Sequence, residues 1–172
     1  MLILLTRYAI QMKMITTLVA ISSFSSVMFA HDIDSLIADG INVHTTKKLL
    51  QICEHGIIVK EFNVSFGRKG VGKKQIGDKK TPLGLYELES PRESNRFGIF
   101  IPIKYPTEQQ LAVGYTGKDV GIHGPFQLFS WLGSLNTTFN WTQGCIAVGK
   151  NEQIKFIANW VKTHPQTKIS VT

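Results

Sequence analysis

Short apolar runs separated by glycine- and proline-rich stretches fill most of this 172-residue chain, and they restrict the fold to one built from short strands. The clearest example is residues 48–66, where two such runs flank a turn at residues 54–56 and predict a β-hairpin. Gly56 supplies the positive φ that a tight turn requires. The side chains expected to face the core from the second strand are Ile58, Phe62, Val64 and Phe66.

The rest of the chain repeats this pattern up to a single helical segment. Residues 151–161 predict a helix capped by Asn151, whose buried stripe consists of Ile154, Ile157, Trp160 and Val161. Residues 32–42 predict a short helix or a lead-in segment. Further strands are predicted at residues 85–89, 97–103, 119–123, 145–148 and 168–172. We therefore expect a mainly β fold, a sandwich or barrel with one late helix.

The first 30 residues contain no acidic side chain and two basic ones, Arg7 and Lys13, ahead of an apolar run that ends at Ala30. This order is typical of a secretory signal peptide. A single membrane anchor is the alternative, but six serine and threonine residues interrupt the apolar run. We therefore expect residues 1–30 to be removed and residues 31–172 to form one domain. That domain would lie in the periplasm or cell envelope without a stable membrane anchor.

The composition excludes several functional classes. Hydrophobic residues make up 43% of the chain, which is enough for a packed core, so a mainly disordered chain is not expected. The five histidines are scattered without a metal-ligand spacing, so we expect no metal. Residues 67–84 are rich in glycine and lysine but lack the phosphate-loop pattern, and we interpret them as a solvated loop. The full chain has a net charge of +7, and removal of residues 1–30 with their two basic side chains would leave +5, which suits anionic envelope polymers. We expect no nucleic-acid partner.

Two segments carry groups suited to nucleophilic catalysis: residues 121–125, which contain His123, and residues 141–148, which contain Cys145. A cysteine attacks as its thiolate, and an imidazole within hydrogen-bond distance can take the thiol proton. Gly144 lets a substrate approach the backbone, whose N–H groups can bind an oxyanion. From these residues alone, a structural histidine in the core is the alternative interpretation of His123.

His123 and Gly124, followed by the run Thr-Gln-Gly-Cys-Ile at residues 142–146, resemble the signature of the L,D-transpeptidase catalytic domain (the YkuD family). The resemblance extends upstream through residues 64–67 and 96–98. It also includes residues 77–86, which read Gly-Asp-Lys-Lys-Thr-Pro-Leu-Gly-Leu-Tyr. It runs from about residue 49 to residue 161, so the expected fold is the β-sandwich or barrel of that family.

The resemblance implies a role for each matching residue. Cys145 would attack the carbonyl that follows a diamino acid in a peptidoglycan stem peptide and form a thioester, while His123 takes the thiol proton. The carbonyl of Gly124 would orient the imidazole, and the N–H groups of Gly144 and Cys145 would form the oxyanion hole. An acceptor amine would resolve the thioester, so the protein would be an L,D-transpeptidase that needs no cofactor. The expected substrate-binding residues are Tyr86, Trp141, Thr142 and Gln143.

Two positions differ from many members of that family. Gln143 stands where many have histidine, and Ala147 stands where many have arginine or asparagine. An arginine at position 147 would bind a substrate carboxylate through two hydrogen bonds. These differences concern the substrate and the acceptor rather than the nucleophile.

Several alternatives stay open at this point. A hydrolase, either an L,D-carboxypeptidase or an amidase, would use the same Cys145 with water in place of the amine. A non-catalytic envelope-binding module would keep the groove without forming a thioester. A papain-like protease is disfavoured because its cysteine precedes its histidine in the chain.

Cys53 raises a further alternative, because a Cys53–Cys145 disulfide would abolish the thiolate. We expect Cys145 to be free and Cys53 to act as a small buried hydrophobic residue. Aromatic side chains between the histidine and the cysteine would either pack in the core or line a substrate groove. Residues 126–140, which contain most of them, are placed to form a flap.

Overall fold

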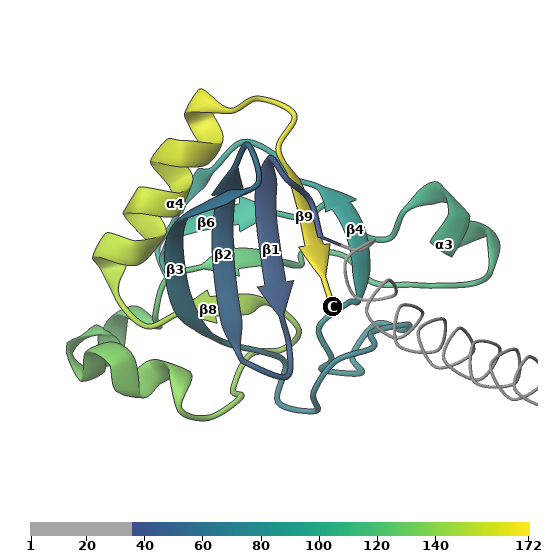
Figure 1. The fold of residues 1–172 in the computed structure, drawn as a ribbon. Helices are drawn as coiled ribbons and strands as arrows, with labels where there is room; N and C mark the ends of the chain where they lie inside the picture. The colour runs from purple at the N-terminus through teal and green to yellow at the C-terminus, as the bar shows by residue number, and fades with distance from the viewer. Residues whose placement is uncertain (1–35) are drawn as a thin grey trace, which may run out of the picture. The chain divides into compact units, whose positions relative to one another are not determined.

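Nine strands form one continuous sheet in residues 36–172, the part of the chain that this computed structural model describes. Their order across the sheet is β4-β9-β1-β2-β3-β8-β7-β6-β5 (Figure 1). The strands are β1 (Gly40–His44), β2 (Leu49–Glu54), β3 (Ile57–Ser65), β4 (Gly84–Glu87), β5 (Arg92–Ser94), β6 (Gly98–Pro102), β7 (Gly121–His123), β8 (Ile146–Val148) and β9 (Lys168–Val171). The helical elements are α3 (Glu108–Ala112), the 3-10 helix η1 (Gln127–Thr137) and α4 (Asn151–Thr163).

The hairpin predicted at residues 48–66 is confirmed as β2 and β3, joined by a two-residue turn at positions 55 and 56. A bulge interrupts its register, because Ile52 pairs with Lys60 whereas Cys53 pairs with Ile58. Before Phe62, the start of β3 has no buried face: Ile57, Ile58 and Val59 are 68%, 51% and 43% exposed, so the prediction that Ile58 faces the core is wrong. The three later side chains of that face, Phe62, Val64 and Phe66, are buried as predicted.

Strand β1 occupies part of the segment for which a helix or lead-in was predicted, so the helix prediction is wrong from Gly40 onward. Ile41 and Val43 alternate into the core, and β1 pairs antiparallel with β2 and parallel with β9. The side-chain amide of Asn42 links β1 to the segment before it. Its oxygen accepts a hydrogen bond from the backbone N–H of Ile37 at 2.9 Å, and its NH2 group donates to the Ile37 carbonyl at 2.8 Å. The signal peptide predicted at residues 1–30, and residues 32–35 of the predicted helix, lie outside the described residues.

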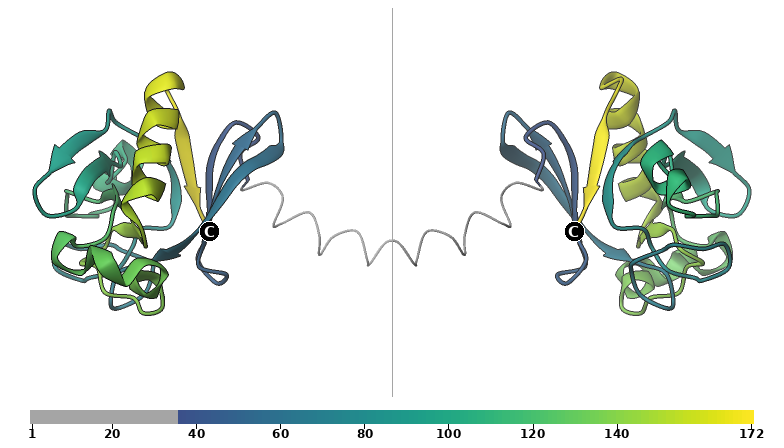
Figure 2. Two further views of the ribbon diagram at one scale, coloured as in Figure 1. Left: turned by 90° about the vertical axis from the view of Figure 1, so that its left-hand side faces the viewer. Right: turned by 90° about the vertical axis from the view of Figure 1, so that its right-hand side faces the viewer.

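The sheet curls around its core (Figures 1 and 2). Backbone hydrogen bonds join the chain after β4 to the end of β6, from Glu89 N to Pro102 O at 2.9 Å and from Lys104 N to Glu87 O at 3.0 Å. Helix α4 packs against β6 and β8 through its buried stripe of Ile154, Ile157, Ala158 and Val161. The mainly β class with one late helix is therefore confirmed.

Helix α4 differs from its prediction in two details. Lys150 is the residue before the helix, and Asn151 is the first helical residue, whose side-chain oxygen accepts a hydrogen bond from Gln127 Nε2 at 3.1 Å. The side-chain oxygen of Gln153 takes over the capping role, because it accepts from both Gly149 N and Lys150 N at 3.0 Å.

None of the helices within residues 36–172 is long and apolar enough to cross a membrane.

Candidate active site

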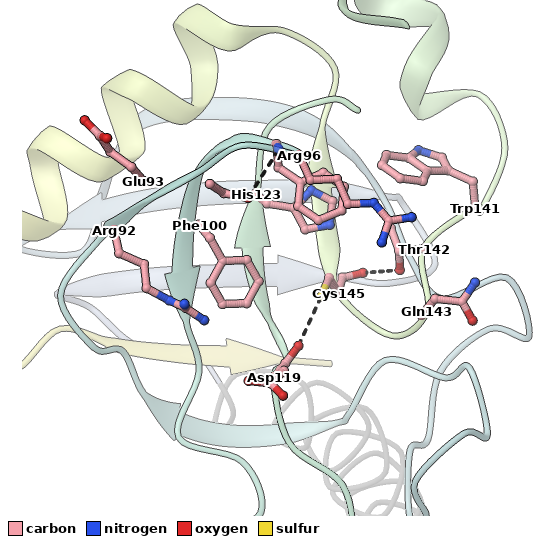
Figure 3. Close-up of a pocket in the computed structure, with 12 residues that line it drawn as sticks. Arg92, Glu93, Arg96, Phe100, Asp119, His123, Trp141, Thr142, Gln143 and Cys145 are labelled. Atoms are coloured by element: carbon pink, nitrogen blue, oxygen red, sulfur yellow. Dashed lines mark hydrogen bonds between the residues drawn. The ribbon is translucent and has the colours of Figure 1, made fainter. Parts of the chain in front are cut away.

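A cleft of about 460 Å³ lies over the face where β6, β7 and β8 run side by side (Figure 3). Five of the residues that line it were expected site residues or come from the segments that carry them: His123, Trp141, Thr142, Gln143 and Cys145. The remaining lining residues come from the β5–β6 hairpin and the segment before β7, namely Arg92, Glu93, Ser94, Arg96, Phe97, Phe100 and Asp119.

The register of two parallel strands brings His123 and Cys145 together. Strand β7 pairs with β8 so that Ile122 lies beside Ile146 and His123 beside Ala147. Because side chains alternate along a strand, Ala147 and the residue two positions before it project from the same face as His123. His123 and Cys145 are therefore diagonal neighbours on one face, and both line the cleft.

The tautomer of His123 follows from one contact. Its Nδ1 atom lies 2.6 Å from the carbonyl oxygen of Gly124. A carbonyl can only accept a hydrogen bond, so Nδ1 carries the proton and Nε2 of the neutral ring keeps its lone pair. Phe97 stacks on the imidazole with ring centroids 3.9 Å apart, and Trp141 meets the same ring edge-on at 5.6 Å. These two aromatic contacts and the Gly124 hydrogen bond thus hold the ring, with Nε2 as the basic atom.

Burial keeps both reactive groups neutral. Desolvation lowers the pKa of His123 to about 4, although the hydrogen bond to Gly124 favours the charged ring, and the Arg96 charge lowers it further. Desolvation likewise raises the pKa of the Cys145 thiol to about 11; a backbone hydrogen bond at Gly121 opposes this effect and the Asp119 charge adds to it. The thiol donates a 3.6 Å hydrogen bond to the Asp119 carbonyl (Figure 3). At neutral pH the site therefore holds a thiol and a neutral imidazole rather than an ion pair.

Gly124 is required by close packing around the base. A Cβ atom at this position would lie 2.6 Å from the carbonyl oxygen of Phe97 and 2.9 Å from Cγ2 of Ile154. Both neighbours are fixed, one as backbone and the other as a fully buried side chain of α4. A glycine is therefore needed for the chain to carry its carbonyl to the imidazole.

Two threonines hold the backbone of the nucleophile. Thr142 Oγ1 donates to the Cys145 carbonyl at 2.7 Å and accepts from Gly144 N at 3.1 Å. Thr81 Oγ1 donates to the same carbonyl at 3.4 Å and accepts from Gly67 N at 2.9 Å. The Gly144 N–H, expected in the oxyanion hole, is thus bonded to a hydroxyl in this state. Gly144 itself has φ +136°, and a Cβ there would lie 2.8 Å from the Lys80 carbonyl oxygen.

An ion pair between a buried lysine and a partly buried aspartate organises the loop behind the nucleophile. Lys73 is 5% exposed, and its Nζ atom lies 2.9 Å from Asp78 Oδ1 and 2.9 Å from the Gln75 carbonyl. The Asp78 carboxylate also accepts from the backbone N–H groups of Lys74, Gln75 and Lys80. Desolvation opposes ionisation of Asp78, but these hydrogen bonds hold its pKa well below the usual range. The interpretation of residues 67–84 as a loop of solvated lysines is therefore wrong for Lys73, and neither Lys73 nor Asp78 was predicted as part of the site.

The expected substrate-binding residues divide into two groups. Gln143 is exposed at the cleft, and Trp141 is partly buried, with its indole N–H donating to the Asn136 carbonyl at 2.9 Å. Thr142 lines the cleft but is 3% exposed, so its hydroxyl serves the backbone of the nucleophile. The structure does not bring Tyr86 to this cleft. Strand β4 turns that ring into the core at 2% exposure, where its hydroxyl donates to the Leu83 carbonyl.

The aromatic side chains of residues 126–140 were expected either to pack in the core or to line a groove, and most of them do not pack in the core. They lie in η1 and its flanks, where Phe129, Trp131 and Phe139 are 50%, 78% and 77% exposed.

Both cysteines are free: Cys53 is buried in β2, and Cys145 lies just before β8, on the other side of β3 from β2. Within the described chain, no group of three or more histidine, cysteine, aspartate or glutamate side chains could hold a metal ion.

The family comparison matches most of this chain. A model of the YkuD family, the L,D-transpeptidase catalytic domain, matches residues 38–171. No curated protein matches the sequence at a significant level. The matched span contains every strand and helix described above, together with the whole of the cleft.

Solved structures share this fold. The helical cell shape determining protein Pgp2 from Campylobacter jejuni is 26% identical with a TM-score of 0.62, over 76% of this chain and 46% of that one. Bd1075 from Bdellovibrio bacteriovorus is 19% identical with a TM-score of 0.58, over 81% and 48%. The catalytic domain of the Enterococcus faecium L,D-transpeptidase is 15% identical with a TM-score of 0.54, over 79% of this chain and 98% of that domain. The chain therefore matches about half the length of the first two proteins and nearly all of the Enterococcus domain.

Proposed function

Because this chain belongs to the YkuD family of L,D-transpeptidase catalytic domains, we propose that it is an exported cysteine acyltransferase that acts on peptidoglycan stem peptides. The observation that carries this proposal is the placement of His123 and Cys145 on one face of adjacent strands, in a cleft large enough for a peptide. The Gly124 contact adds to it, because it leaves Nε2 of the ring available as a base.

In the first half of the reaction, the Cys145 thiol turns from the Asp119 carbonyl to His123. Nε2 of His123 then takes the thiol proton as the sulfur attacks the carbonyl that follows the diamino acid. The tetrahedral intermediate then collapses to a thioester, and His123 returns the proton to the amine of the leaving D-amino acid. Burial makes both charged forms costly before substrate arrives, so proton transfer coincides with attack.

The oxyanion that forms during attack needs hydrogen-bond donors from the backbone around the nucleophile. We assign this role to the N–H groups of Cys145 and Gly144. The Gly144 N–H would turn from the Thr142 hydroxyl, or share its proton, as the negative charge develops. The remaining hydrogen bonds from Thr142 and Thr81 to the Cys145 carbonyl keep the loop in place during that change.

In the second half, an acceptor amine attacks the thioester and forms a new peptide bond, which gives a crosslink or an exchanged terminal group. Water in place of the amine would give hydrolysis, the reaction of an L,D-carboxypeptidase. The Campylobacter relative is described as a helical cell shape determining protein, and we extend that context to cell-wall organisation and cell shape here. The signal peptide expected at residues 1–30 would direct export and then be removed, and no resident cofactor is needed.

The test is product analysis with purified muropeptides. The mature protein, residues 31–172, is incubated with tetrapeptide stems with and without an added acceptor amine, and products are separated by liquid chromatography and mass spectrometry. The proposal predicts a crosslinked or exchanged product that Cys145→Ala does not form. Release of the terminal D-amino acid alone would reassign the protein as a hydrolase that uses the same nucleophile. A protein that binds stems and leaves them intact would be an envelope-binding module.

A further inference from the structure

Large apolar side chains project into solvent from η1 and the residues just after it. We call five of them the apolar patch: Leu128, Phe129, Trp131, Leu135 and Phe139. Each is at least half exposed, and the two leucines are exposed to 73% and 66%. Single exposed apolar residues are common on soluble proteins, whereas several gathered in one short segment mark a surface that contacts another molecule or a membrane.

Polar contacts hold the backbone of this segment from the side of the sheet. Lys48 Nζ donates to the carbonyls of Thr137 and Thr138 at 2.7 and 3.0 Å. The side-chain amide of Asn136 donates to the carbonyl of Gly149, just after β8, at 3.3 Å. Thr137 is the one buried residue of η1. The segment is thus attached through its polar groups, and its large apolar side chains are left on the outside.

The surroundings of the apolar patch are positively charged. Residues 120–151 contain no acidic side chain, and Lys150 at their end is exposed. The neighbouring loop, residues 67–84, has one acidic residue, which is paired with Lys73. Its basic residues are Arg68, Lys69, Lys73, Lys74, Lys79 and Lys80. This loop begins beside the end of the patch segment, where Arg68 N donates to the Thr142 carbonyl at 2.9 Å. In Figure 1, the loop and η1, drawn in green, lie at the same lower end of the sheet.

We propose that the apolar patch binds the surface of a bilayer that contains anionic phospholipids. Trp131, Phe139 and the leucines of the patch enter the headgroup region, where aromatic and aliphatic side chains leave water without having to cross the bilayer. The basic side chains of residues 67–84 meet the lipid phosphates, which attract lysine and arginine close to the membrane surface. The contact is peripheral and reversible, and it does not depend on the proposed reaction.

Shape and charge favour a membrane over other occupants of the patch. Trp131 and Phe139 protrude singly, so a protein partner would need a matching pocket for each, whereas a fluid bilayer needs none. Lysine is depleted at protein–protein interfaces. A second copy of this chain would bring the same positive border against its own, which like charges oppose. A neutral sugar polymer would leave that border without an anion.

The apolar patch is continuous with the catalytic cleft. A hollow of about 300 Å³ lies between them and includes Phe129 of the patch among its lining residues. Arg96 and Trp141 line both this hollow and the cleft. A bilayer bound by the patch would therefore lie close to the mouth of the cleft, and the enzyme would act on stems near the membrane.

The test measures co-sedimentation of the mature protein, residues 31–172, with vesicles. This form is used because the apolar run within residues 1–30 would itself bind lipid. One set of vesicles contains phosphatidylglycerol and phosphatidylcholine in equal parts, and the other contains phosphatidylcholine alone. We expect the wild type to bind the anionic vesicles more tightly than the neutral ones, and to bind them more weakly as the salt concentration rises.

A matched pair of double variants tests the apolar contribution. Trp131→Ser with Phe139→Ser should bind anionic vesicles roughly 100-fold more weakly, because each large side chain that leaves water contributes about tenfold. Ile57→Ser with Ile58→Ser removes two exposed apolar side chains beside the β2–β3 turn, at the opposite end of that hairpin from Lys48, and should bind like the wild type. Thermal melting of each variant verifies that its fold is retained.

A second double variant tests the charge. Arg68→Gln with Lys69→Gln should weaken binding to anionic vesicles by roughly fivefold for each charge and leave binding to neutral vesicles unchanged. A wild type that ignores both kinds of vesicle, or equal vesicle binding by the wild type and the Trp131 and Phe139 variant, overturns the inference. Loss of binding to purified sacculi, or of a dimer in sedimentation, in that variant without any vesicle binding would assign the patch to glycan or to a second copy. All these readings are made without substrate, so they are independent of the proposed function.

Discussion

Nδ1 of His123 lies 2.6 Å from the carbonyl oxygen of Gly124, and this contact orients the base without adding a charge beside it. A carboxylate in the same place would favour the imidazolium and raise its pKa. The carbonyl is a weaker influence, so desolvation dominates and the pKa of His123 falls to about 4. The site is therefore neutral at rest, and the first predictions below follow from that state.

The neutral state predicts how Cys145 reacts with a small alkylating agent. Because burial raises the pKa of the thiol to about 11, the iodoacetamide rate should rise about tenfold per pH unit between pH 7 and pH 10. Intact mass spectrometry measures the rate, and Cys145→Ala corrects for any reaction at the buried Cys53. A plateau of the rate between pH 5 and pH 8 would instead indicate a preformed thiolate–imidazolium pair.

The lowered pKa of His123 also predicts a pH dependence of folding stability. The folded state holds this ring neutral down to about pH 4, whereas the unfolded chain protonates it near pH 6.5. Between these values the unfolded state binds more protons, so stability is full above pH 6.5 and is lost as the pH falls toward 4. The contribution is about 3 kcal/mol. Urea unfolding of wild type and His123→Gln at pH 4.5 and pH 7 checks it, since the variant should lose less stability on acidification.

Gly144→Ala should inactivate the protein more than it unfolds it. The substitution combines a φ of +136° with a Cβ placed 2.8 Å from the Lys80 carbonyl oxygen, so the backbone beside Cys145 must shift. A displacement of this kind costs roughly 100-fold in kcat/KM, with a stability loss of about 1–3 kcal/mol. The matched control is Gly114→Ala, which has φ +85° but open space around its Cβ. If both variants lose activity equally, backbone strain alone explains the effect and the packing argument fails.

The ion pair of the buried Lys73 with the partly buried Asp78 predicts a stability effect that an exposed pair does not share. Lys73→Met leaves the Asp78 carboxylate without its cation, and we expect a loss of about 3 kcal/mol in the free energy of unfolding. Lys104→Met breaks a 2.6 Å pair with Glu87 in which both side chains are more than half exposed, and it should cause no measurable change. Equal effects of the two substitutions would show that burial does not determine how much the Lys73 pair contributes to the free energy of unfolding.

Part of this fold was predictable because local patterns determine it. Alternating apolar residues and a glycine turn predicted the β2–β3 hairpin, and the 3.6-residue period predicted α4. The bulge at Ile52 and Cys53 was not predictable, since an extra residue in one strand leaves no mark in the hydrophobic pattern. Strand β1 was misread because residues 33, 36 and 37 also fit a helical spacing, and its pairing with the distant β9 determines the outcome.

The site was predictable where its residues carry a motif and not where they act through packing. His123 and Cys145 could be paired from their types and order, and the register of β7 and β8 places them together. Lys73 resembled its exposed neighbours, because only the folded loop brings Asp78 to it and buries the lysine side chain. Arg92 lies in the three-residue strand β5, and Arg96 lies just after it. This segment has no apolar pattern that would predict its place, so the position of both arginines in the cleft follows from the pairing of β5 with β6. Tyr86 was assigned to the substrate from the motif alone, and the alternation of β4 turns it inward.

The central claim is that the sulfur of Cys145 forms a covalent acyl intermediate with His123 as its base. Intact mass spectrometry after incubation with a carbapenem or a tetrapeptide stem tests it most directly, with Cys145→Ala and His123→Gln alongside. The account predicts one added acyl mass on the wild type, none on Cys145→Ala, and formation slowed by roughly 100-fold or more on His123→Gln. An adduct that persists in Cys145→Ala, or a wild type that never gains mass while still converting the stem, would contradict it.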